Sequence, residues 1–283
     1  MRVSLSITQF PADAGHTPLD RIVRAADDGG IDTVWVADHL VQYAPGTEPT
    51  DPHLEAYTTL GWLAARSERV RLGAMVSPVT FRPPTLLIKA VSTLATLSGG
   101  RAWLGVGTGY HEQEAAQMGI PMPPLAERFE RLEDTLQLAH RMFAGDDTAF
   151  EGRHVRAGRP LNHPTPARRP RILVGGAGEK KTLPLVARYA DACNLFDIPD
   201  GGVTLRRKLD VLAQACEDAG RPRAEIETTV GTALHPDETP AAFAERCAAL
   251  GELGAEHVGV ITRTPWTDDD LARLAEGARL LAA

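Results

Sequence analysis

The stretch V-R-L-G-A-M-V-S-P-V-T-F-R-P-P-T-L-L-I-K-A-V-S-T-L-A-T-L-S-G-G-R-A-W-L-G-V-G, from Val70 to Gly107, contains a complete strand–helix–strand unit. Its two ends, residues 70–76 and 102–106, are short apolar runs of the length of a buried strand. Between them, residues 84–97 repeat apolar side chains at helical spacing and stop at a Gly-Gly pair. This alternation predicts two parallel strands joined by a crossover helix.

The same alternation continues along the chain in both directions. It predicts eight strands, each followed by a helix, and eight is a number at which a parallel sheet closes. We therefore expect an α/β protein with a single (β/α)8 TIM-barrel domain over residues 1–283. An open doubly wound sheet is the alternative, but it usually carries a G-x-G-x-x-G turn after its first strand, and residues 8–15 contain none. The expected strands are residues 2–7, 33–36, 70–76, 102–106, 171–174, 192–196, 226–233 and 257–261.

One long irregular stretch, residues 144–170, interrupts the pattern between the fourth and fifth expected strands. It holds four prolines and follows an amphipathic helix expected over residues 129–143. We expect it to be an excursion of the barrel that covers the barrel mouth rather than a linker between domains.

The composition excludes several classes of partner. A net charge of -7 with both signs interspersed argues against nucleic acid or an acidic membrane surface. No apolar run approaches the ~20 residues that span a bilayer, and the N-terminal residues lack the pattern of a secretion signal. Three widely spaced cysteines fit reduced thiols better than a disulfide framework. We therefore expect a cytoplasmic protein with a small-molecule partner.

Residues just past each strand are the informative ones, because a barrel of this type assembles its active site from the loops at the C-terminal ends of its strands. Asp38 and His39 follow the second strand, where an acid and an imidazole can orient a ring system and move one proton near neutral pH. A local turn with a half-exposed histidine is the alternative. Met75 and Val76 end the third strand, where they either back a flat ring or are simply buried.

Two glycine-rich turns could bind a ligand through backbone amides. G-V-G-T-G-Y, Gly105–Tyr110, follows the fourth strand, and V-G-G-A-G-E-K-K, Val174–Lys181, follows the fifth. Glycines let the backbone approach a ligand closely, and amides at a helix N-terminus with lysines nearby favour phosphate. A tight structural turn is the alternative for each. The nine histidines form no pair at metal-ligand spacing on strand ends, so we expect no metal site.

Five segments, spread over nearly the whole chain, occur together in a characteristic order. They are D-T-V-W-V-A-D-H-L, L-G-A-M-V-S-P-V-T-F-R-P-P, W-L-G-V-G-T-G-Y, E-R-F-E-R-L-E-D-T-L and I-L-V-G-G-A-G-E-K-K-T-L. In this order and spacing the chain resembles the luciferase-like monooxygenase superfamily and, more narrowly, its coenzyme F420-dependent oxidoreductases. No single motif carries the resemblance.

The resemblance implies a cofactor site at the C-terminal ends of the strands. Asp38 would contact the deazaflavin ring of F420, and His39 would face the substrate and handle a proton. The Met75–Val76 peptide would be cis, forming a bulge that bends the ring. Further implied cofactor contacts are Thr108, Gly109 and Gln113 along the tail, and Gly175, Gly176, Ala177 and Gly178 around the phosphate.

The resemblance also implies an activity, namely hydride transfer between F420 and a small organic substrate in a homodimeric enzyme. Members that oxidise a sugar phosphate look to carry a glutamate directly after G-T-G, where this chain has Tyr110. This departure disfavours sugar-phosphate oxidation and leaves Tyr110 as a proton donor or as a pocket wall. An FMN-dependent monooxygenase on the same barrel and a non-catalytic flavin-binding protein stay open as alternatives.

Overall fold

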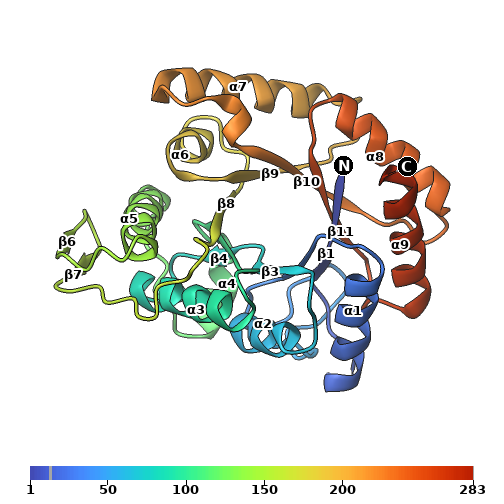
Figure 1. The fold of residues 1–283 in the computed structure, drawn as a ribbon, viewed down its shortest axis with the longest axis horizontal. Helices are drawn as coiled ribbons and strands as arrows, with labels where there is room; N and C mark the ends of the chain where they lie inside the picture. The colour runs from blue at the N-terminus through green and yellow to red at the C-terminus, as the bar shows by residue number, and fades with distance from the viewer. Residues whose placement is uncertain (13–14, 283) are drawn as a thin grey trace.

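The protein is a barrel of parallel strands surrounded by helices (Figure 1), in a computed structural model that describes residues 1–12 and 15–282. The barrel strands are β1 Arg2–Ile7, β2 Thr33–Val36, β3 Arg71–Ala74, β4 Ser77–Pro78, β5 Trp103–Gly107, β8 Arg171–Gly175, β9 Ala192–Phe196, β10 Glu227–Ala233 and β11 His257–Ile261. Their order in the sheet is β3-β2-β1-β11-β10-β9-β8-β5-β4, and their pairings are parallel.

The ring closes between β3 and β5. Leu72 and Ala102 form a parallel bridge, and the amide of Leu72 donates to the carbonyl oxygen of Arg101. Since β4 pairs with β5 further along, β3 and β4 are the two halves of one barrel strand that is interrupted at Met75 and Val76. The eight strands expected from the sequence are therefore confirmed.

Helices cover the outside of the ring, as Figure 1 shows. They are α1 His16–Asp28, α2 Ala56–Ala64, α3 Pro84–Leu97, α5 Leu125–Phe143, α6 Thr182–Tyr189, α7 Val203–Ala219, α8 Pro240–Glu252 and α9 Asp268–Ala282, with a 3-10 turn η1 at Arg223–Glu225. A further helix, α4 Glu112–Gln117, lies instead in the loop after β5, at the C-terminal ends of the strands. The short helix α4 was not expected, because six residues are too few to show a helical period. Among the residues described, no helix has the length and apolar character needed to cross a bilayer.

The excursion between the fourth and fifth barrel strands lies elsewhere than expected. It forms a small hairpin, β6 Phe150–Glu151 and β7 Arg156–Ala157, beside α5 on the outside of the barrel (Figure 1). The buried carboxylate of Asp134, on α5, accepts hydrogen bonds from the backbone amides of the hairpin turn, at 2.7 Å from His154 and 3.0 Å from Val155. The prediction that this segment covers the barrel mouth is therefore wrong.

Two tryptophans fill the interior of the barrel below its C-terminal end. The rings of Trp35 and Trp103 lie 5.6 Å apart, and both side chains are fully buried. A Cβ atom at Gly73 would come within 2.7 Å of the ring of Trp35 and 2.8 Å of the Cβ atom of Trp103, so only glycine fits between these side chains. Met75 and Val76 pack on this cluster from above. The bulge in the third strand is therefore supported from below by tightly packed tryptophan side chains.

A charged network closes the opposite end of the barrel, where the strands begin. The carboxylate of Glu227 lies 2.9 Å from a guanidinium nitrogen of Arg2 and 2.9 Å from Nδ1 of His257, and it also accepts from Arg171. Burial acts to raise the pKa of Glu227, but the hydrogen bond from His257 and the neighbouring positive charges outweigh it and lower the pKa to about 2. Glu227 is therefore ionised at neutral pH.

Acid should destabilise the fold through Glu227. A carboxylate whose pKa is lowered in the folded state stabilises that state above its unfolded pKa, and the contribution disappears as the pH falls through the folded value. The shift from 4.5 to about 2 corresponds to roughly 3 kcal/mol at neutral pH. Urea denaturation should show a lower unfolding free energy for Glu227→Gln at neutral pH and a flatter decline between about pH 5 and about pH 2. The exposed Glu276→Gln is the control, and an unchanged pH profile in Glu227→Gln would contradict this account.

Candidate active site

A cavity of about 720 Å³ lies at the C-terminal ends of the strands. All eight barrel strands or the residues directly after them contribute to its wall, as expected for a site built on a closed ring. One contribution from each in chain order is Ser6, Ala37, Val76, Gly107, Gly175, Asn194, Gly231 and Gly259.

The structure brings most of the expected site residues to this cavity. Those that line it are His39, Met75, Val76, Thr108, Gly109, Tyr110, Gly175 and Gly176. The Met75–Val76 peptide is cis, as the resemblance implies. Four other residues lie outside the lining, namely Asp38, Gln113, Ala177 and Gly178. Gln113 and Gly178 are exposed. Contact between these four and a cofactor stays a prediction.

His39 is held by a buried glutamate that the sequence analysis missed. Its Nδ1 lies 2.6 Å from Oε2 of Glu114, whose side chain is fully buried. The other carboxylate oxygen accepts from the backbone amide of Leu40. Because Glu114 occupies Nδ1, the second ring nitrogen, Nε2, is left for a ligand in the cavity. The pair fixes both the tautomer and the direction of the imidazole.

The charge of Glu114 is stabilised by its partners. Burial acts to raise its pKa, but the hydrogen bonds from His39 and from the amide of Leu40 outweigh burial and hold the pKa below its usual value. The carboxylate is therefore an anion at neutral pH. An anion on Nδ1 favours a proton on that nitrogen and stabilises the imidazolium that forms when Nε2 takes up a second proton.

Aromatic rings enclose the imidazole of His39. Tyr43 stacks on it, with ring centroids 3.6 Å apart and planes 22° apart. Tyr110 and His111 meet it edge-on, at 5.8 and 5.9 Å. Although Tyr110 is 67% exposed, partial desolvation beside its neighbours, together with the charge of Glu114, raises its pKa above the usual value. Tyr110 is therefore neutral at physiological pH and keeps a hydroxyl proton that it can donate.

Asp38 turns away from the cavity and binds an arginine. Its carboxylate accepts two hydrogen bonds from Arg82, at 2.6 and 3.0 Å, and is completely buried. A further hydrogen bond of 2.6 Å links Arg82 to Glu55, and its guanidinium lies 4.9 Å from the ring centroid of Tyr57. This pairing anchors the chain directly before His39, so the geometry favours a positioning role for Asp38 over contact with a ring.

Glycines around the cavity have two roles: some make room for the side chain of Val76, and others leave space inside the cavity. At Gly107 and Gly175 a Cβ atom would come within 2.9 and 2.8 Å of the methyl groups of Val76, so these glycines make room for the bulge. At Gly231 and Gly259 the nearest atoms would be 3.6 and 3.7 Å away, which is ordinary contact. Packing does not demand glycine at these two positions. Because neither residue has a side chain, the part of the cavity wall formed by Gly231 and Gly259, which we call its floor, stays open.

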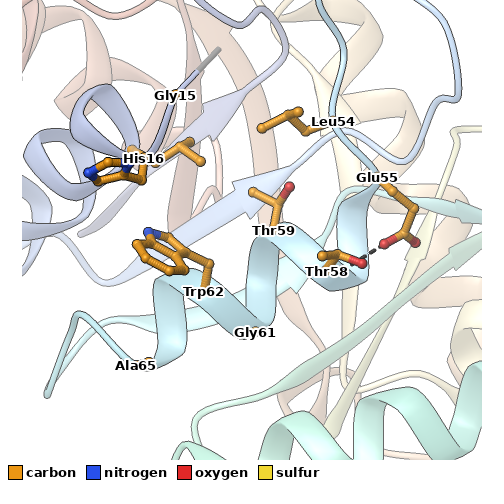
Figure 2. Close-up of a pocket in the computed structure, with 10 residues that line it drawn as sticks. Gly15, His16, Leu54, Glu55, Thr58, Thr59, Gly61, Trp62 and Ala65 are labelled. Carbon is orange, nitrogen blue, oxygen red and sulfur yellow. Dashed lines mark hydrogen bonds between the residues drawn. The ribbon is translucent and has the colours of Figure 1, made fainter.

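A second hollow, of about 490 Å³, lies outside the ring between α1 and α2 (Figure 2). Figure 2 shows His16 and Trp62 facing each other across it, with ring centroids 6.0 Å apart. The indole nitrogen of Trp62 donates to Asp20 at 2.9 Å. The residues that line this hollow include none of the expected site residues, so the candidate active site is the cavity inside the barrel.

Comparison with curated proteins relates the chain to one group of enzymes. The F420-dependent glucose-6-phosphate dehydrogenase of Kineococcus radiotolerans is 31% identical over 223 residues, which cover 76% of this chain and 63% of that protein. The enzyme of the same name from Beutenbergia cavernae is 30% identical over 83% of this chain and 70% of its own length. This chain therefore spans slightly less than two thirds of the first relative and slightly more than two thirds of the second.

Solved structures with low sequence identity share the fold. An F420-dependent secondary alcohol dehydrogenase in complex with an F420-acetone adduct superposes with a TM-score of 0.84 at 15% identity, over 99% of this chain and 98% of the other. The coenzyme F420-dependent tetrahydromethanopterin reductase of Methanopyrus kandleri gives a TM-score of 0.78 at 16% identity, with the same coverage.

The family follows from a match over almost the entire length. A family model described as luciferase-like monooxygenase matches residues 3–276. This range includes all barrel strands except the first residue of β1 and all the residues that line the cavity. The chain belongs to the luciferase-like monooxygenase family.

Proposed function

We propose that this protein is a coenzyme F420-dependent oxidoreductase that moves a hydride between the deazaflavin and a small organic substrate. The names of its relatives and of two structural neighbours support F420 as the cofactor. The observation that carries the proposal is the pair of His39 and Glu114, which presents one free imidazole nitrogen to a cavity of about 720 Å³ at the active-site end of a barrel.

The cavity suits a flat heterocycle with a phosphorylated tail. Gly231 and Gly259 leave its floor open, so a ring can lie against the backbone there. Gly176, at φ +109°, stands in the turn that leads to α6, where backbone amides can approach a phosphate. When bound, F420 supplies the ring carbon that accepts or gives the hydride. We propose that the cofactor contacts are Met75, Val76, Thr108, Gly109, Gly175 and Gly176, with Gln113, Ala177 and Gly178 nearer the tail.

His39 would handle the proton that accompanies the hydride. With Nδ1 held by Glu114, its Nε2 can accept the proton of a substrate hydroxyl or return a proton to a carbonyl oxygen. Tyr110 stands edge-on to His39 with its hydroxyl protonated, so it is placed to wall the substrate or to donate a hydrogen bond to it. Asp38 would act through Arg82, by keeping His39 in place.

Glu114 should be required for efficient turnover. In Glu114→Gln the amide can still form a hydrogen bond, but the negative charge that stabilises a protonated His39 is lost. We expect kcat to fall by roughly ten- to a hundredfold with little change in KM. Glu112→Gln is the matched control, because Glu112 lies on the same helix with 76% of its side chain exposed. Equal kcat values for Glu114→Gln and Glu112→Gln would remove Glu114 from the mechanism.

Titration with two cofactors tests the proposed function. The purified protein is titrated with F420 and, separately, with FMN, and cofactor fluorescence is recorded. We expect F420 to bind at least about tenfold more tightly than FMN. Tighter binding of FMN would favour a monooxygenase, and binding of neither would contradict the proposal.

A substitution on the floor locates the cofactor within the barrel. Gly259→Leu would fill the open floor and should abolish F420 binding, whereas Gly61→Leu, on the surface of α2 with no atom within 4 Å of its Cβ position, should not. Unchanged F420 affinity in Gly259→Leu would place the cofactor elsewhere.

We further propose that the protein acts in the cytoplasm as a homodimer. Its three cysteines are free and buried, which suits a reducing compartment. Sedimentation equilibrium should give twice the 30.4 kDa mass of the chain, and a mass of one chain at micromolar concentration would contradict the dimer.

A further inference from the structure

Residues 42–54, between β2 and α2, form a loop whose two ends lie close together beside His39. The rings of Tyr43, near its start, and His53, near its end, have centroids 6.2 Å apart. Tyr43 stacks on His39 and lines the cavity, so the loop forms part of the cavity wall. The tip of the loop, at residues 48–51, is exposed. Compact surface loops of this length with adjacent ends often have a function.

Among the described residues, the hydrogen bonds of the 42–54 loop stay within the loop. The amide of Thr47 donates to the carbonyl oxygen of Ala44 at 3.1 Å, and the amide of Asp51 donates to that of Glu48 at 2.9 Å. Three of its thirteen residues are prolines, which have no amide hydrogen to donate. The loop therefore keeps its own shape without hydrogen bonds to the barrel.

The bonds that fix the chain to the barrel lie just outside the loop. Before it, the backbone amide of Leu40 donates to the carboxylate of Glu114. After it, the carboxylate of Glu55 accepts from Arg82 at 2.6 Å. Between these anchors only packing holds the loop in place. Such a segment can move as a unit about its two ends, because few backbone angles need to change.

His53 opposes the observed position of the loop. Both of its ring nitrogens are shielded from solvent, and neither has a hydrogen-bond partner in the part of the chain that the structure describes. The carbonyl oxygen of Ala37 lies near the ring without reaching hydrogen-bond geometry. Burial of an unpaired polar group costs free energy that water would restore if the loop moved outward. An apolar ring could pack edge-on to Phe10, as His53 does at 5.1 Å, without this cost.

A positive charge on His53 would oppose the observed position more strongly. The groups around the ring are His39 and Tyr43 on the same segment, Glu114 on α4, and the apolar ring of Phe10 after β1. Burial and the neighbouring His39 outweigh the attraction of Glu114 and lower the pKa of His53 to about 4. In a loop that has moved outward, the imidazole would titrate near its usual pKa of 6.5. Protonation therefore favours outward movement as the pH falls from about 6.5 to about 4.

We propose that the 42–54 loop is a lid over the active site and that His53 is the positioning residue that determines how often the lid opens. Packing of Tyr43 on His39 favours the closed position, and the unpaired imidazole of His53 limits its stability. Opening withdraws Tyr43 from the cavity wall and gives ligands access to His39. The consequence for catalysis rests on the proposed function, whereas the movement of the lid itself requires no cofactor.

Distance measurements between two spin labels test the lid in the protein without cofactor. Labels are attached to Glu48→Cys at the tip of the loop and to Val203→Cys on α7, where the side chain is 64% exposed. The natural cysteines are buried and should not react. Between pH 7.5 and pH 5.0, we expect the ratio of open to closed lid to rise about thirtyfold, as the two pKa values of His53 require. The open lid appears as a second label-to-label distance.

Two variants make this measurement specific to His53. In the labelled protein, His53→Phe should abolish the response to pH, while His235→Phe, at an exposed histidine, should leave it unchanged. The same distances at both pH values in the natural protein would overturn the inference, and so would an equal pH response in His53→Phe. Failure of the proposed function is distinguishable, because it appears as absence of F420 binding and leaves these distances unaffected.

Urea denaturation at neutral pH provides a second readout. His53→Phe and the smaller His53→Leu remove the unpaired nitrogens, so at least one of them should unfold at a higher urea concentration than the natural protein. The two side chains differ in size, which separates the loss of polarity from a misfit in packing. Lower midpoints in both variants would show that the imidazole stabilises the closed loop, and would overturn the inference.

Discussion

Replacing His39 with alanine should lower kcat by roughly 10²- to 10⁴-fold while F420 still binds with its normal affinity. The expectation follows from geometry, because Glu114 holds Nδ1 at 2.6 Å and leaves Nε2 as the available nitrogen of an imidazole that lines the cavity. Alanine removes the group that moves the proton but leaves the open floor and the glycine turns unchanged. The measurement is turnover at saturating substrate, together with F420 fluorescence titration of each variant.

Two companion variants make this result specific. His39→Asn keeps a hydrogen-bond donor toward Glu114 but cannot carry a proton, so it should be as slow as the alanine variant. His154→Ala is the matched control, because His154 also pairs with a glutamate, Glu130 at 2.7 Å, but lies on the hairpin outside the barrel. Full turnover in His39→Ala with normal F420 affinity would show that the proton follows another route.

The second large effect concerns stability and comes from Asp38. Removal of its carboxylate in Asp38→Ala leaves the guanidinium of Arg82 buried, with only Glu55 to balance it. Breaking one side of a buried ion pair costs roughly 3–5 kcal/mol, because the remaining charge has lost its partner away from water. Urea denaturation should show this loss. Turnover should fall as well, since His39 follows Asp38 directly.

A double variant separates lost pairing from lost packing. Asp38→Ala with Arg82→Leu removes both charges, so it should recover much of the stability lost in Asp38→Ala alone. Glu151→Ala is the control, because Glu151 and Arg156 form an ion pair in which both side chains are more than 70% exposed, and such pairs contribute little. If Asp38→Ala unfolds at the same urea concentration as Glu151→Ala, the pair does not stabilise the fold.

Most of the barrel could be predicted because its signals are local. In the segment from Val70 to Gly107, the helix expected over residues 84–97 has the bounds observed for α3. Apolar period and stop signals depend on neighbouring residues, and these are visible in the sequence. The excursion was misplaced for the opposite reason. Its position depends on Asp134, which reaches its amides across 19 to 21 residues.

The site could be predicted only in part. His39 was found because it directly follows a strand, and the position of strand ends in a barrel is fixed by the fold. Its partner Glu114 is 75 residues away and lies on a helix too short to reveal its inward face, so no local signal identified it. The pairing of Asp38 with Arg82 spans 44 residues in the same way. Contacts of this kind exist only once the ring has closed.

The closed N-terminal end of the barrel determines from which side ligands can enter and leave the cavity. Among the described residues, Trp35 and Trp103 fill the interior and the ion network around Glu227 occupies the base, so we expect ligands to reach Gly259 from the C-terminal ends of the strands. Whatever lies deepest must enter first and leave last. We therefore expect the proposed cofactor, if it lies against Gly259, to bind before the substrate and to leave after it.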